Sequence, residues 1–365
     1  MDEPSGDLSH LHVALAGGGS GGHVFPALAV AEELRRRGCA VSFLGSPHGF
    51  EARLVPERGI DFHPLPARPV VGRGPWGKAR AGWTLLGSTW RARRLLRRLD
   101  ARVVLGTGGY VSVAPVLGAR LAGVPVVLLE PNAAPGAANR TLSRWAAGAC
   151  LAFAAAERRL RCPGWVTGVP VREAFFAVPR QLPGGGRRLL VLGGSQGALQ
   201  LDRLLPAALA AVVEQIAPLA VLHQCGTAHV EATREAYAAH SLPGVEVEVV
   251  PFLERVDQAM AASHLVVSRA GAITLAELCA AGRGSLLVPL ALAEAHQARN
   301  AEAMEAAGAA RLIPTAEATA QQLGSLLAEL VPDRGRLQAM ADAARALARP
   351  NAAAAIVERL REVAG

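Results

Sequence analysis

The sequence predicts an α/β protein made of two Rossmann-like, doubly wound parallel-sheet domains that face a central cleft. Short apolar runs typical of buried parallel strands alternate with helical segments along the chain. A strand, a glycine loop and a helix also begin twice, first around Gly17 and again around Gly193. A chain of 365 residues is longer than one hydrophobic core usually covers, so we expect two domains.

The first domain is expected over residues 8–167. Residues 11–16 form a short apolar run of the buried-strand type, and the glycine loop at 17–22 follows directly. Pro26 suits the first turn of the next helix, and Gly38 suits its end. Further strands are expected in "AVSFLG", "ARVVLGTGGY" and "VPVVLLEPN".

The second domain is expected over residues 168–347. The segment "VTGVPVREAFFAVPRQLPGGGRR" is rich in Pro and Gly, and we expect it to act as a hinge between the domains. Strands are then expected in "RRLLVLG", "AVLHQCG", "VEVVPF", "HLVVS" and "GSLLVPL". The last segment, 348–365, has a helical pattern and is expected to pack back on the first domain.

The composition limits the classes of function. Apolar residues make up 51% and charged residues 19% of the chain, as in a folded protein. The net charge is +8, nearly all from arginine because Lys78 is the only lysine. This excess fits a GC-rich genome, or affinity for phosphates or an anionic membrane surface. The five cysteines are scattered without a C-x-x-C pair, which argues against a zinc site or disulfides and favours a reducing cytoplasm.

Other classes are also disfavoured. The first residues lack the basic and apolar regions of a signal peptide, and no uncharged apolar run is long enough to span a membrane. Aromatic residues are only 4% of the chain, and no basic–aromatic module occurs, which argues against nucleic-acid binding.

The first glycine loop contains the pattern G-x-G-x-x-G at Gly17, Gly19 and Gly22. A dinucleotide site also needs an acidic residue about 20 positions later, but 42–49 contain none and Glu51 comes too late. A nicotinamide or flavin oxidoreductase is therefore the disfavoured alternative. A glycine loop at a helix start still suits an anion. His23 follows the loop, where a neutral imidazole could take a proton from a sugar hydroxyl; the alternative is a residue that only fills the first turn.

Polar residues in the second half follow the ends of predicted strands. In "SRAGAITLAELCAAG", Thr274 and Glu277 share one helix face, where a carboxylate can accept hydrogen bonds from both hydroxyls of a ribose. The helix start would face a diphosphate. Ser195 in "GGSQGA" and Gln297 in "HQARNA" add polar groups at neighbouring junctions. An ordinary amphipathic helix with an exposed glutamate is the alternative.

These motifs together resemble the MurG family of peptidoglycan glycosyltransferases, which belongs to family 28 and has the GT-B fold. The resemblance rests on "GGGSGGHVFPALAVAEEL", "GTGGYVSVAPVLGARLAGVPVVLLEPN", "GVPVR", "GGSQGA" and "SRAGAITLAELCAAG…HQARNA", which occur in the family's order over roughly 11–313. It implies inverting transfer of GlcNAc from UDP-GlcNAc to the C4 hydroxyl of MurNAc in lipid I, which gives lipid II and UDP. It thereby implies a role in cell wall biogenesis, cell shape and cell division.

The resemblance also implies site residues. His23 matches the candidate general base. Acceptor contacts fall on Gly18, Gly19, Gly108, Gly109 and Tyr110. Donor contacts fall on Ser20, Gly21, Gly22, Asn132, Arg172, Ser195, Leu253, Ala272, Ile273, Thr274, Leu275, Ala276, Glu277 and Gln297. Two positions depart from the family's usual "HEQN", because Leu129 and Pro131 replace a histidine and a glutamine. Ala270 replaces the serine of "SRSGA".

A segment of the first domain suits a membrane surface. Trp76, Trp83 and Trp90 recur every seven residues, followed by Arg91, Arg93, Arg94, Arg97 and Arg98. The alternative is a helix with a core face and a solvated arginine face. A lipid-linked acceptor favours peripheral binding to the cytoplasmic face of the inner membrane, with other cell-wall synthesis proteins as further partners.

Three alternatives stay open beside this interpretation. They are another GT-B transferase acting on a glycolipid, a UDP-GlcNAc 2-epimerase, and a non-catalytic sugar-nucleotide binder. The sequence predicts no metal site and no cofactor, and it leaves open whether Mg²⁺ accompanies the acceptor diphosphate.

Overall fold

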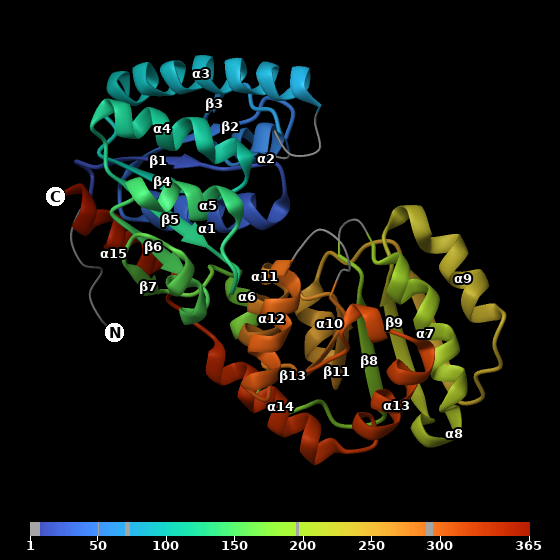
Figure 1. The fold of residues 1–365 in the computed structure, drawn as a ribbon. Coiled ribbons are helices and arrows are strands. Elements are labelled where there is room, and N and C mark those ends of the chain that lie inside the picture. The colour runs from blue at the N-terminus through green and yellow to red at the C-terminus, as the bar shows by residue number, and fades with distance from the viewer. Residues whose placement is uncertain (1–7, 50, 70–73, 195–196, 290–294) are drawn as a thin grey trace. The chain divides into compact units, whose positions relative to one another are not determined.

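The computed structural model describes residues 8–49, 51–69, 74–194, 197–289 and 295–365. The chain forms two compact units (Figure 1): Met1–Pro170 with Asn351–Gly365, and Val171–Pro350. The chain thus enters the second unit after Pro170 and returns after Pro350, where the sequence predicted passages after 167 and 347.

The first unit is built on a fully parallel sheet. Its strand order is β3-β2-β1-β4-β5-β6-β7, so the direction of winding reverses between β1 and β4. Loops at such a reversal leave the sheet at its carboxyl edge, where open α/β sheets bind ligands. The strands are β1 (His12–Ala16), β2 (Ala40–Gly45), β3 (Asp61–Pro64), β4 (Val103–Gly106), β5 (Val126–Glu130), β6 (Gly148–Leu151) and β7 (Gly164–Val166).

Helices cover both faces of this sheet because alternate strand residues point to opposite sides. Val13 and Leu15 belong to a core cluster with residues of the helices α1 and α15. Ala14 and Ala16 belong to a second cluster with residues of α3 and α4. Figure 1 shows these two helix layers. The helices are α1 (Gly21–Arg36), α2 (Glu51–Glu57), α3 (Pro75–Arg98), α4 (Val113–Ala122), α5 (Ala137–Leu142) and α15 (Ala352–Ala364), with the 3₁₀ turns η1 (Tyr110–Ser112), η2 (Ser143–Trp145) and η3 (Ala154–Arg159).

The start of α1 differs from the prediction. Pro26 was expected in the first turn, but α1 begins at Gly21, so Pro26 lies inside the helix. The glycines at 21 and 22 are therefore helical rather than part of the loop. As a result His23 lies in the first turn, where its N–H and that of Val24 both donate to Ser20 O, at 3.1 and 3.2 Å.

The last helix belongs to the first unit. Ile356, Val357 and Leu360 of α15 are buried in the same core cluster as α1. Arg37, at the end of α1, forms an ion pair with Glu358 of α15.

The second unit repeats the doubly wound pattern. Its parallel sheet has the order β10-β9-β8-β11-β12-β13, and the winding reverses between β8 and β11. The strands are β8 (Arg187–Leu192), β9 (Leu219–Gln224), β10 (Val245–Val250), β11 (Leu265–Ser268), β12 (Ser285–Leu287) and β13 (Ala310–Leu312). The helices are α6 (Glu173–Phe176), α7 (Leu199–Ala211), α8 (Val213–Ile216), α9 (Val230–Ala238), α10 (Val256–Ala262), α11 (Ala272–Ala281), α12 (Ala295–Ala306), α13 (Ala320–Leu330) and α14 (Arg334–Leu347), with the turns η4 (Thr227–His229) and η5 (Thr315–Glu317).

Two arginines fix α11 in this unit. The fully buried Arg283 donates to the carbonyls of Met260 and Ala261 at the end of α10, Ala281 and Gly282 at the end of α11, and Pro179. Arg345 of α14 donates to carbonyls of Phe176, Val178, Ala280 and Ala281. Cations are favourable at helix C-termini, where carbonyls lack helical partners. Burial lowers the pKa of Arg283 to about 10, so it stays protonated near pH 7.

No helix in the described part of the chain is both long and apolar enough to cross a membrane.

Candidate functional site

In the first unit, the loops that follow β1 and β4 meet at the winding reversal. The imidazole of His23 lies on the backbone of Gly108 and Gly109. A methyl group placed on Gly108 would lie 3.1 Å from His23 Cε1, and one on Gly109 would lie 3.1 Å from His23 Cδ2. Both glycines have left-handed φ angles, 94° and 73°, which other residues rarely adopt. The ring therefore depends on glycine at both positions.

Tyr110 and the first glycine loop lie beside this ring. A methyl group on Gly19 would lie 3.3 Å from Tyr110 Cε1, and the Tyr110 side chain is exposed. Ser20 is the N-cap of α1, and it too is exposed. The structure thus brings together the predicted acceptor residues, His23 and the predicted contacts at Ser20, Gly21 and Gly22.

A buried carboxylate holds the loop that follows β5. Glu130 is 1% exposed and accepts hydrogen bonds from the backbone N–H groups of Asn132 and Gly136, both at 3.0 Å. It also accepts from Asn132 Nδ2 at 3.0 Å and Asn139 Nδ2 at 2.9 Å. Asn132 is therefore oriented by Glu130. Asn139 lies 3.3 Å from a methyl group placed on Gly108, which links this loop to the ring of His23.

Leu129 stands where the usual family pattern has a histidine. It lies in β5, is 1% exposed and belongs to the core cluster that includes α1. Its side chain therefore packs in the core of this chain, whereas its neighbours Glu130 and Asn132 supply the polar groups.

In the second unit, α11 carries the predicted ribose contact. Its N-cap is Gly271, which has no side chain to accept hydrogen bonds from the first-turn N–H groups. Glu277 is 19% exposed, and its Oε1 lies 3.9 Å from Arg172 Nη2. Arg172, the N-cap of α6, is largely exposed and lies over the Phe175 ring at 5.0 Å. The helix start, the carboxylate and a cation thus lie near one another.

Burial raises the pKa of the Glu277 carboxyl to about 7. Arg172 opposes this rise, and the carboxylate of Asp257 adds to it. Asp257 itself is held ionised, because its hydrogen bonds with Arg255 lower its pKa. Near neutral pH, Glu277 therefore lies between its charged and neutral forms.

Side chains that the sequence did not single out hold the neighbouring loops. Gln224, at the end of β9, accepts from Gly194 N–H at 3.1 Å and donates to Gly194 O and Pro251 O. The buried Asn300 of α12 donates to Ala270 O at 3.2 Å. Gln297 of the same helix is buried, and Leu253 is half-buried after β10. Ser195 lies outside the described residues.

A second polar group lies beneath the start of α7. Asp202 is buried, with Oδ1 3.1 Å from His223 Nε2 and Oδ2 3.3 Å from His229 Nδ1. His223 Nδ1 lies 2.9 Å from the Tyr237 hydroxyl. A hollow of about 270 Å³ lies beside His229, and its lining residues are Gly197, Ala198, Leu199, Gln200, Leu201, His229, Arg269 and Val288. The sequence did not predict this network.

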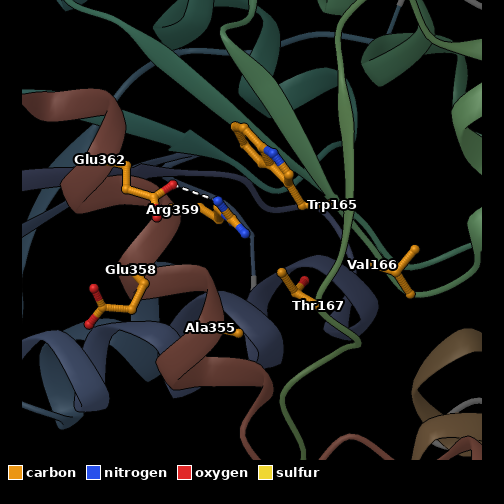
Figure 2. Close-up of a pocket in the computed structure, with 7 residues that line it drawn as sticks. All are labelled: Trp165, Val166, Thr167, Ala355, Glu358, Arg359 and Glu362. Carbon is orange, nitrogen blue, oxygen red and sulfur yellow. Dashed lines mark hydrogen bonds and ion pairs between the residues drawn. The ribbon is translucent and has the colours of Figure 1, made fainter.

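The first unit has a hollow of about 490 Å³ between β7 and α15 (Figure 2). Arg359 lies over the Trp165 ring at 5.3 Å and pairs with Glu362 at 2.6 Å, so its charge is used within the fold. The residues that line this hollow are Trp165, Val166, Thr167, Ala355, Glu358, Arg359 and Glu362, and none was predicted as a site residue.

Sequence reasoning set aside one residue of the first unit that touches the site. Glu51 was discounted as too late for a ribose contact, yet its carboxylate accepts from Gly19 N–H at 3.2 Å. The sequence contained part of the evidence for this contact, since Glu51 is the acidic residue that follows the second predicted strand most closely.

Comparisons with known proteins match a separate domain model to each half of the chain. The N-terminal domain model of glycosyltransferase family 28 matches residues 13–150, and the C-terminal domain model matches residues 188–359. A relative from Stutzerimonas stutzeri strain A1501 is 45% identical over 361 residues, which are 97% of this chain and 99% of that protein. A relative from Pseudomonas syringae pv. tomato is 43% identical over the same shares. Both are named UDP-N-acetylglucosamine–N-acetylmuramyl-(pentapeptide) pyrophosphoryl-undecaprenol N-acetylglucosamine transferase.

Solved structures give the same result. The crystal structure of Acinetobacter baumannii MurG matches with a TM-score of 0.83 and 34% identity, over 96% of this chain and 99% of that chain. A putative UDP-N-acetylglucosamine 2-epimerase from Listeria monocytogenes matches with a TM-score of 0.66 and 16% identity, over 96% of this chain and 95% of that one, which shows the fold alone.

The fold and these matches define a two-domain glycosyltransferase of the GT-B class. The chain belongs to glycosyltransferase family 28. The predicted fold class and the resemblance to the MurG family are thereby confirmed.

The contact of His23 with Gly109 gives a testable prediction. In Gly109→Ala, the new methyl group would lie 3.0 Å from Gly18 O and 3.1 Å from His23 Cδ2, so the ring must move. If the His23 ring takes part in glycosyl transfer, its displacement should lower the rate by about a hundredfold or more, and the NMR signals of His23 should shift. Gly123→Ala is the matched control, because Gly123 has a similar φ of 78° but nothing within 4 Å. Equal losses of transfer in the two variants would attribute the effect to backbone strain alone.

Proposed function

We propose that this chain is the inverting transferase that moves GlcNAc from UDP-GlcNAc to the C4 hydroxyl of MurNAc in lipid I. The products are lipid II and UDP, and the reaction belongs to peptidoglycan synthesis. The observation that carries this proposal is the similarity at 43–45% identity, over almost the whole length, to relatives named for this transfer. The cluster of His23 with the two glycine loops, and that of Arg172 with Glu277, supply the chemistry.

The second unit would hold the donor. The carboxylate of Glu277 accepts hydrogen bonds from the ribose hydroxyls, while Arg172 and the start of α11 offset the negative charge that grows on the departing UDP. Gln297, on α12, would contact the sugar. The proposed reaction uses no resident cofactor. The described residues contain no group of three or more His, Cys, Asp or Glu that could hold a metal ion.

The first unit would hold the acceptor. The C4 hydroxyl oxygen attacks the anomeric carbon on the face opposite UDP, and the bond from that carbon to the phosphate oxygen breaks with inversion. His23 accepts the hydroxyl proton as general base. Because Gly108 and Gly109 hold its ring, the base stays in place before the acceptor binds.

The first experiment measures transfer of labelled GlcNAc from UDP-GlcNAc to a short-chain lipid I analogue, with UDP release followed in parallel. We expect both in equal amounts. In His23→Ala, kcat should fall by about 10²–10⁴, the usual contribution of general base catalysis, while UDP-GlcNAc binding changes less than twofold.

Either of two outcomes would contradict this assignment. Full transfer by His23→Ala would remove His23 as the base. Tight UDP-GlcNAc binding without transfer to the lipid I analogue would point to another acceptor or to a sugar-nucleotide binder, and formation of a 2-epimer would point to an epimerase.

The raised pKa of Glu277 predicts how donor binding depends on pH. At pH values below its pKa of about 7, the Glu277 carboxyl is mostly protonated and cannot accept hydrogen bonds from both ribose hydroxyls. UDP-GlcNAc has no group that titrates near this pH, so its dissociation constant should be about tenfold larger at pH 6 than at pH 8.

Isothermal titration calorimetry tests this prediction. In two buffers of different ionisation enthalpy, the wild type should release about half a proton on binding at pH 7, since the carboxyl is then half protonated. Glu277→Gln should bind more weakly, without either the pH dependence or the proton release. A pH-independent dissociation constant in the wild type would refute the role of the ionised carboxylate.

We further propose that the chain binds the cytoplasmic face of the inner membrane through α3. Trp76, Trp83 and Trp90 recur every seven residues along one face of this helix, and their side chains are 90%, 76% and 53% exposed. Leu86 is also exposed there. Single exposed apolar residues are common, but four on one helix form a surface suited to a headgroup layer.

Vesicle partitioning tests this surface. Arg91, Arg94, Arg97 and Arg98 are exposed, whereas Arg93 donates to Leu121 O, so the variant replaces only the first four with glutamine. At about 1 kcal/mol per arginine near an anionic surface, binding to phosphatidylglycerol vesicles should fall at least tenfold. A Trp76→Ser, Trp83→Ser double variant should also bind more weakly, whereas Trp145→Ser, an exposed tryptophan outside α3, should not. Unchanged partitioning in both α3 variants would refute the proposal.

A further inference from the structure

Glu51 is a buried carboxylate that the mechanism above does not use. Glu51 is 0% exposed and lies at the start of α2, beneath the first glycine loop. Oε2 accepts from Gly19 N–H at 3.2 Å, and Oε1 accepts from Ser46 N–H at 3.0 Å. The side chain therefore joins the loop after β1 to the loop after β2.

Three glycines make room for this one side chain. A methyl group would lie 2.0 Å from Glu51 Oε1 at Gly18, 2.6 Å from its Cγ at Gly45 and 2.3 Å from its Oε2 at Gly49. Gly18 and Gly19 also have positive φ angles of 155° and 80°. Part of the glycine content of the motif thus serves to enclose an acid of the chain itself.

The hydrogen bond between Gly19 and Glu51 changes what the loop can bind. In a Rossmann glycine loop, backbone N–H groups usually face a phosphate of the ligand. Here the N–H of Gly19 is already donated to Glu51 Oε2, so it is not available to a phosphate, and the acceptor oxygens of Glu51 disfavour a diphosphate placed against the same residues. A neutral ligand meets no such repulsion.

A second observation indicates what that neutral ligand would present. The carbonyl oxygen of Gly18 and the ring of His23 border the same point above Gly109, at 3.0 and 3.1 Å from a methyl group placed there. A carbonyl oxygen accepts hydrogen bonds from hydroxyl groups and repels phosphate oxygens. The acceptor group beside the base therefore suits a sugar hydroxyl.

We propose that Glu51 is the internal anion of the first glycine loop: it occupies the anion-receiving side at Gly18 and Gly19, and so reserves this part of the site for the uncharged sugar ring. This inference rests on the proposed function and makes Glu51 a positioning residue. The acceptor contacts that the family resemblance implies at Gly18 and Gly19 would then be made by the sugar ring.

The kinetic test uses the full chain with Glu51→Gln, which keeps the shape but offers one acceptor oxygen to two N–H donors. We expect kcat with the lipid I analogue to fall at least tenfold and the acceptor KM to rise, while the KM for UDP-GlcNAc stays within twofold. Glu57→Gln, at the exposed end of the same helix, is the matched control and should behave as the wild type. Wild-type kcat and acceptor KM in Glu51→Gln would overturn the proposal, even if the melting temperature fell.

Glu51→Ala tests the anion itself without needing activity. This variant leaves a cavity with two free N–H donors, so formate should raise its melting temperature by several degrees and shift the Gly19 amide signal. The wild type and Glu51→Gln should not respond. Inorganic pyrophosphate should compete with the lipid I analogue at least tenfold more strongly in Glu51→Ala than in the wild type. If Glu51→Ala fails to fold, the comparison of Glu51→Gln with Glu57→Gln still decides.

The two proposals fail in different ways. Absence of transfer in both the wild type and Glu57→Gln would refute the proposed function, while the formate response would still test Glu51. No response of folded Glu51→Ala to formate, or equal pyrophosphate inhibition in wild type and variant, would overturn the role of Glu51.

Discussion

Parallel strands end together at one edge of a sheet, and the loops that follow them leave backbone N–H and C=O groups that no strand pairs. Burying such groups without partners is costly, so each loop that approaches a ligand needs a side chain to satisfy it. In this chain Glu51 accepts a hydrogen bond from the loop after β1, and Glu130 accepts from the loop after β5. Gln224 accepts from the loop after β8, and Asn300 donates to the loop after β11. The candidate site depends on these four side chains as much as on the residues that would touch substrate.

Whether the supporting side chain is acidic or basic follows from the backbone groups with which it forms hydrogen bonds. Loops at the start of helices expose N–H donors, and in the first unit carboxylates accept from them. Helix ends expose carbonyls, and in the second unit Arg283 and Arg345 donate to those at the ends of α10 and α11. Because α11 also carries Glu277, these arginines fix the carboxylate that would meet the ribose. Among the described residues neither the buried Arg283 nor the half-buried Arg345 forms an ion pair with a carboxylate, and several carbonyl dipoles take the place of one anion.

Sequence periodicity was sufficient for the architecture and insufficient for these supports. Apolar runs and glycine loops located both sheets, because strand order follows from the doubly wound pattern. The family resemblance, rather than the periodicity, implied that His23, Gly108 and Gly109 belong to one site. The start of α1 was misplaced by the usual preference of Pro26 for a first turn, which two helical glycines overrode. Glu51 was weighed only as a ribose ligand, since spacing along the chain does not reveal a side chain that folds back beneath a loop. Asn139 and Gln224 carry no motif, so only the fold reveals their contacts.

The distribution of charge matches the two ends of the proposed reaction. A nucleophilic hydroxyl is neutral and needs an acceptor for its proton, so it suits the first unit, where Glu51 and Glu130 already occupy N–H groups of the loops and Gly18 O lies beside His23. A departing diphosphate is anionic and needs a cation and free N–H groups, which Arg172 and the uncapped start of α11 provide in the second unit. Exchanging these surroundings would place an anion against carboxylates in one unit and leave a hydroxyl without a base in the other. Two units with the same sheet topology thus differ in a few charged side chains, and this difference, rather than the shared fold, supports the proposed placement of acceptor and donor.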